Sequence, residues 1–98
     1  MPRYLIERHF TVTPDGMPSL GRKSNEVLRD EVTAVIWEHS HVVVGEDGLV
    51  ITFCIYDAPG EEEVLRHSQL LGAHHIASVH EIAGDVTPND FPPVEESA

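Results

Sequence analysis

Residues 37–56 read WEHSHVVVGEDGLVITFCIY, two β-rich runs joined by a short segment that contains glycine and acids. This pattern is typical of a β-hairpin. A tight two-residue turn is expected either at residues 46–47 or at residues 47–48. Both turns give the paired strands the same parity, so the residues that share a face of the hairpin are the same whichever turn forms.

Side chains alternate between the two faces of a strand, so residues two apart share a face. With either turn, His41 stands opposite Thr52 or Cys54. One face is then expected to combine two imidazoles, a thiol, a phenol and an indole, from Trp37, His39, His41, Thr52, Cys54 and Tyr56. Such a set is typical of metal ligation or of an interface.

The elements around the hairpin predict the fold. Strands are expected at residues 3–11, 34–44, 49–57 and 76–83, and helices at 19–30 and from 61 to the stop at Gly72. The β-α-β-β-α-β order predicts the ferredoxin-like α+β fold, a four-stranded antiparallel sheet with two helices on one face. In this topology the first strand is central, beside the third and the fourth.

The patterned part of the chain ends before its C-terminus. Residues 1–84 are expected to form one ferredoxin-like domain, and residues 85–98 a polar tail rich in proline and acid. Phe91 is the only aromatic residue of this tail. We expect it to pack on a neighbouring surface, the partner subunit of a dimer being one option.

Composition narrows the class of partner. The 98 residues include 17 acids against 6 lysines and arginines, a net charge of −11, which disfavours nucleic acid and favours cations. Cys54 is the single cysteine, so no disulfide forms within the chain. Neither a signal peptide nor an apolar run of about 18 residues is visible, so we expect a cytoplasmic protein without a membrane partner.

The two faces of the third strand differ in character. Ile51, Phe53 and Ile55 are uniformly apolar and are expected to lie under the helices. The face with Trp37 and Tyr56 is then left open, and we expect it to be buried in a homodimer. This assignment places the polar residues 38 and 40 on the covered side, and a bulge near them would change it locally.

Several stretches match a known pattern: residues 3–8, Trp37 to Ser40, residues 52–59 (TFCIYDAP), the spacing of Val64, His67 and Gly72, and residues 80–82. They resemble a bacterial family of small ferredoxin-like domains of unknown function, one of whose members is a nickel-binding dimeric protein. The resemblance covers residues 1–84 and is most specific from Cys54 to Gly72. The resemblance implies the fold, a homodimer and nickel binding, but it does not identify which residues of this chain would bind nickel.

Seven residues are candidate metal ligands: Glu7, His9, His39, His41, Cys54, His67 and Glu81. His39 and His41 lead this set, because imidazoles two apart on a strand lie roughly 6–7 Å apart at Cβ and suit nickel or zinc. Cys54 can instead be a small core residue, and His67 a half-buried histidine near a helix end.

Two further groups of residues are interpreted as structural. Glu7 shares a face with His9 in a central strand and needs a partner, which Glu81 or a histidine could supply. The adjacent residues 74–75, both histidines, are expected in a surface loop.

Three functions remain open. The favoured one is a homodimer that binds nickel or a similar divalent ion. The second is a dimer that binds a small ligand in an aromatic cleft. The third is a cofactor-free enzyme of the dimeric α+β-barrel type. For Cys54 as a nucleophile, His39 or His41 could act as base, but no orienting partner is evident, so no catalytic residue is assigned.

Overall fold

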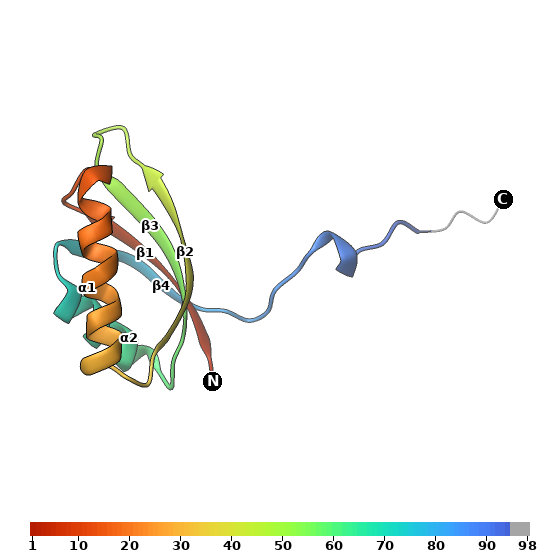
Figure 1. Cartoon of the computed structure of the whole chain (residues 1–98). Helices are drawn as coiled ribbons and strands as arrows, with labels where there is room; N and C mark the ends of the chain where they lie inside the picture. The colour runs from red at the N-terminus through yellow and green to blue at the C-terminus, as the bar shows by residue number, and fades with distance from the viewer. Residues whose placement is uncertain (95–98) are drawn as a thin grey trace.

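The computed structural model describes residues 1–94. Its elements are β1 (Arg3–Phe10), α1 (Met17–Asp30), β2 (Ile36–Val44), β3 (Val50–Asp57), α2 (Glu61–Leu71) and β4 (His74–Glu81), with short 3-10 helices η1 (Pro14–Gly16) and η2 (Pro88–Asp90). The strands pair in the antiparallel order β2-β3-β1-β4, and both α-helices lie on one side of the sheet (Figure 1). The ferredoxin-like α+β fold is confirmed. No helix within residues 1–94 is long and apolar enough to cross a membrane.

The exposure of β1 alternates along the strand and defines the two faces of the sheet. Tyr4, Ile6, Arg8 and Phe10 are buried beneath the helices. The residues between them are half-buried and lie on the side that neither α1 nor α2 covers. We call these sides the covered face and the open face.

The two faces of β3 are the reverse of the expected ones. Val50, Thr52, Cys54 and Tyr56 are buried on the covered face. Ile51, Phe53 and Ile55 lie on the open face, where they pair with His9, Glu7 and Leu5. The prediction that these three apolar residues lie under the helices is therefore wrong. The helices instead cover a partly polar cavity, so this side of β3 carries hydroxyl groups and a thiol.

The turn of the hairpin spans residues 46–48, one residue more than expected. The Gly48 N–H donates to the Gly45 carbonyl oxygen at 2.9 Å, and Gly48 has a φ of 81°. Positive φ at this position is typical of three-residue hairpin turns and favours glycine. The odd loop length shifts the pairing by one, so His41 pairs with Phe53 rather than with residue 52 or 54.

A register shift between Trp37 and His39 separates the two ends of β2. Trp37 pairs with Tyr56 on the covered face, whereas His39 pairs with Ile55 on the open face. Glu38 is the extra residue of this bulge. The six hairpin residues therefore do not share a face: the two histidines are open, and Trp37, Thr52, Cys54 and Tyr56 are covered. The bulge occurs where the polar residues 38 and 40 fitted the simple alternation poorly.

Two local boundaries also differ. His74 and His75 belong to β4, where they pair with Phe10 and His9, so the prediction of a surface loop is wrong. Helix α1 begins at Met17 rather than at Ser19. The earlier start follows from the turn of η1, which leads directly into α1.

After β4 the chain leaves the sheet and extends away from it (Figure 1). Arg3 forms ion pairs with Asp85, near the start of this segment, and with Glu38 in the bulge of β2. Phe91 is 69% exposed, so it does not pack on the described part of its own chain. Its contact with a partner subunit stays a prediction.

Candidate functional site

The open face gathers most of the histidines around an apolar centre. Register places His39 and His41 in β2, His9 in β1, and His75 and His80 in β4 on this face. Phe53, Ile55 and Leu5 occupy the middle strands between them. Four of the seven predicted metal candidates, His39, His41, Glu7 and His9, therefore fall into two groups on either side of an apolar strip.

The first group is the pair in β2. The rings of His39 and His41 have centroids 5.2 Å apart and an interplanar angle of 85°. Both residues are exposed. Nickel and zinc bind imidazole nitrogen, with a metal–nitrogen distance of about 2.0–2.1 Å for zinc, so rings this close can reach a common ion.

The second group lies across β1 and β4. Glu7 Oε2 is 2.5 Å from His9 Nε2, so a histidine satisfies the need of this central glutamate for a partner. The His75 ring stacks on His9 with centroids 5.2 Å apart. Glu81 does not join them, since it is exposed and pairs with Tyr4 at the far end of β4.

Within residues 1–94 no group of three or more histidine, cysteine or acidic side chains is arranged to hold a metal ion. Cys54 lies on the covered face, where its thiol donates to Thr52 Oγ1 at 3.1 Å, so the sheet separates it from His39 and His41. Cys54 is thus neither a co-ligand of these histidines nor a nucleophile with either of them as base.

His67 is fully buried and both of its ring nitrogens are engaged. Arg8 Nη2 lies 3.2 Å from Nδ1, and Ser24 Oγ lies 3.0 Å from Nε2. A guanidinium only donates hydrogen bonds, so Nδ1 accepts and Nε2–H donates to Ser24. Burial, and then the charge of Arg8, lower the pKa of His67 to about 4. This neutral, occupied imidazole is not available as a metal ligand.

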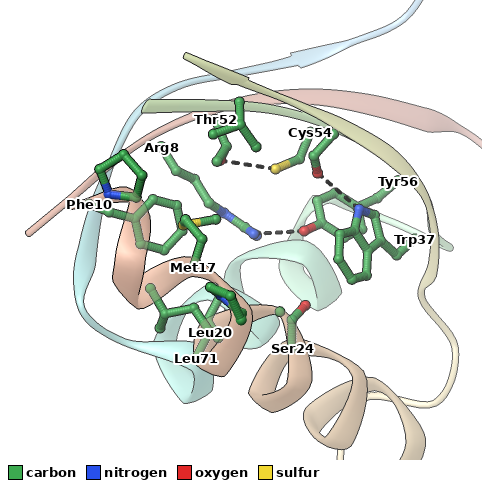
Figure 2. A pocket seen from close by; sticks show the side chains of 15 residues that line it. Arg8, Phe10, Met17, Leu20, Ser24, Trp37, Thr52, Cys54, Tyr56 and Leu71 are labelled. Atoms are coloured by element: carbon green, nitrogen blue, oxygen red, sulfur yellow. Dashed lines mark hydrogen bonds between the residues drawn. The ribbon is translucent and has the colours of Figure 1, made fainter. Parts of the chain in front are cut away.

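A cavity of about 470 Å³ lies between α1 and the covered face of β2 and β3 (Figure 2). Its apolar wall includes Phe10, Met17, Leu20, Trp37 and Leu71. The volume falls within the roughly 300–1,000 Å³ of typical small-molecule pockets. The aromatic cleft expected between two subunits is therefore replaced by a cavity inside one chain, with Trp37 and Tyr56 in its lining.

Polar groups on the cavity wall are hydrogen-bonded in pairs. Arg8 Nη1 donates to the Tyr56 hydroxyl at 2.7 Å, and Figure 2 shows the arginine reaching across the cavity to it. Burial raises the pKa of Tyr56, which the neighbouring guanidinium opposes, so the phenol stays protonated. Trp37 Nε1 donates to Ser40 Oγ at 2.9 Å. Trp37, Ser40 and Tyr56 belong to the hairpin of β2 and β3, whereas Arg8 belongs to β1.

Arg8 is the residue that sequence reasoning missed. Its position in β1 is in phase with Tyr4, Ile6 and Phe10, and that alternation is a signal that it faces the helices. A charged residue in phase with the core side of a central strand is unusual. Arg8 therefore could have been found from the strand pattern alone.

Comparisons with known proteins agree with this fold. A model of the family described as "Nickel responsive protein SCO4226-like" matches residues 4–90. Among solved structures, the chain is similar to the one described as the crystal structure analysis of SCO4226 from Streptomyces coelicolor A3(2). The two share 21% identity with a TM-score of 0.62, over 85% of this chain and 99% of that chain. A search of curated proteins finds no match.

Proposed function

This chain belongs to the SCO4226-like family of nickel responsive proteins, and from that membership we propose that it binds nickel, or a similar divalent ion, as a homodimer. The observation that supports the proposal most is the pair His39 and His41 on the open face, with ring centroids 5.2 Å apart. Two exposed imidazoles this close form half of a four-coordinate site.

The second half of the site is expected from a second copy of the chain. Within residues 1–94 no group of three or more candidate ligands is arranged to hold a metal ion, so one chain offers its ligands only in pairs. A two-fold axis near β2 brings one His39–His41 pair from each subunit to the same ion. Such self-complementary contacts are the commonest form of protein dimer.

The open face itself supports association. Leu5, Ile51, Phe53 and Ile55 are only half-buried in one chain, and Val43 beside them is 43% exposed. Burying such a face stabilises a dimer by about 25 cal/mol per Å² of apolar area before the costs of association. The paired faces would also exclude water from the ligating imidazoles.

Charge and thiol chemistry fit this proposal. The net charge of −11 attracts cations to the surface. Cys54 is a buried thiol without a disulfide, as is typical of proteins in the reducing cytoplasm, where we place this one.

Native mass spectrometry of the untagged protein with added nickel tests the proposal. We expect a dimer that carries one nickel ion for each pair of chains. In the double variant His39→Ala/His41→Ala this ion is lost, since the remaining histidines of the open face lie on other strands. Zinc in place of nickel then measures the preference between the two ions.

His74→Gln is the matched control, because His74 lies on the covered side and its Nδ1 is 2.7 Å from the Gly72 carbonyl oxygen. It should bind nickel as the wild type does. Undiminished nickel binding by the double variant would move the site to His9 and His75. A wild-type protein that takes up no nickel contradicts the proposal.

A further inference from the structure

Arg8 carries a buried positive charge into the cavity. It is 1% exposed and lines the space between α1 and β3. Its hydrogen-bond partners are the Tyr56 hydroxyl, His67 Nδ1 and the Ser68 hydroxyl. Each of these partners is electrically neutral, because burial keeps Tyr56 protonated and His67 unprotonated.

No carboxylate within residues 1–94 forms an ion pair with Arg8. The Tyr56 ring, whose centroid is 5.0 Å from the guanidinium carbon, supplies only a cation–π contact. Taking a charge out of water without an opposite charge is costly, and buried charges in proteins are normally paired. The charge of Arg8 is thus uncompensated within the described chain.

Arg8 also retains hydrogen-bonding capacity. A guanidinium has five N–H donors, and three contacts occupy Nη1 and Nη2. Nε is buried and has no hydrogen-bond partner. The donors left free are therefore Nε–H and one N–H of Nη1, and a carboxylate oxygen is a strong acceptor for either of them.

We propose that this cavity binds a small organic carboxylate, with its anionic group on Arg8 and its apolar body against Phe10, Met17, Leu20 and Trp37. A single positive charge matches a single negative charge, which favours a carboxylate over a phosphate group. The apolar wall favours an aryl or alkyl body over a polar acid. This inference concerns the covered face and does not depend on nickel binding at the open face.

Phenylacetate and its neutral analogue phenylacetamide test the inference, because they have the same shape and differ in charge. Trp37 is the only tryptophan of the chain and lines the cavity, so its fluorescence reports binding there directly. We expect phenylacetate to change the emission saturably, and the amide to bind at least about ten-fold more weakly. Equal affinities of the two compounds, or no saturable change with phenylacetate, would overturn the inference.

Two variants test the charge of Arg8 and the space of the cavity separately. Arg8→Met removes the charge and keeps an apolar side chain, so it should bind phenylacetate at least about ten-fold more weakly. Gly21→Leu acts independently of Arg8: Gly21 lines the cavity, and a Cβ added there has no neighbour within 4 Å. The leucine should occupy part of the cavity and weaken phenylacetate binding.

Gly21→Ala is the matched control for the filling variant, since it adds the Cβ without the bulk and should still bind. If Gly21→Leu binds phenylacetate as the wild type does, the ligand lies elsewhere and the inference is wrong. The two Gly21 variants do not depend on Arg8→Met, so they test the inference even if Arg8→Met does not fold.

Discussion

Arg8 and His67 share a buried hydrogen bond in which the guanidinium donates and the imidazole accepts. The bond exists only while Nδ1 of His67 carries no proton. Protonation of His67 would place a second positive charge 3.2 Å from the first, at a fully buried position. The covered side of the sheet is therefore stable only with a neutral His67.

The first prediction concerns the pH dependence of unfolding. Unfolded histidine takes up a proton near pH 6.5, whereas folded His67 does so only near its lowered pKa of about 4. Its contribution is fully present above about pH 6.5 and is lost as the pH falls toward 4, by up to about 3 kcal/mol. Urea unfolding at several pH values between 4.5 and 7 measures this loss.

His67→Gln should have a lower stability at neutral pH and a flatter dependence below it. His74 adds a smaller effect in the same direction, because burial also lowers its pKa. The exposed His80, changed to Gln, is the control and should keep the wild-type slope. An unchanged slope in His67→Gln would show that another group is responsible.

The second prediction concerns the open face. Phe53→Glu places a charge in the middle of the apolar strip, directly opposite Glu7 and His41 in the ladder. We expect sedimentation to show monomers for this variant and dimers for the wild type at micromolar concentration. Leu70→Glu is the control: Leu70 is 39% exposed but lies on α2, so its replacement should leave the dimer intact.

The third prediction concerns two glycines of opposite conformation. Gly21→Ala lies within α1 and has open space around its Cβ, so it should stabilise the protein by roughly 0.5–1 kcal/mol. Gly48→Ala should destabilise it, because alanine is strained at a φ of 81°. Thermal unfolding of both variants measures the difference. A loss of stability in Gly21→Ala would contradict the open space described around it.

The fourth prediction concerns the tail. Because Phe91 is 69% exposed in one chain, Phe91→Ala should not change the melting temperature of the protein when it is diluted to monomers. If Phe91 packs on the partner subunit, the same variant should weaken dimerisation. Equal dimer dissociation constants for the variant and the wild type would exclude that contact.

The sequence predicted the order of elements because each element carries its own local signals. Helix α2 shows this best, since three glutamates begin it and Gly72, with a φ of 71°, ends it. The pairing of β1 with β3 and β4 then followed from topology alone. The ends of the elements depend on residues close together in the chain, which is why they could be predicted from the sequence.

The faces of the sheet could not be derived in the same way. Hydrophobicity selected Ile51, Phe53 and Ile55 as core, but an apolar open face and a partly polar cavity reverse that ranking. The parity of β2 depended on a turn of three residues and on the bulge at Glu38. The turn and the bulge each shift the register by one residue and so exchange the two faces of the strand. Neither of them alters the alternation of residue types that the sequence shows.

The bulge at Glu38 has a consequence for how this strand can evolve. β2 is an edge strand that pairs only with β3. Here, deletion of one residue at the bulge would either turn Trp37 out of the cavity or turn His39 and His41 into it. Natural variation in β2 should therefore consist of substitutions at constant length, and a lineage that loses one residue there should lose the proposed function of one face or of the other.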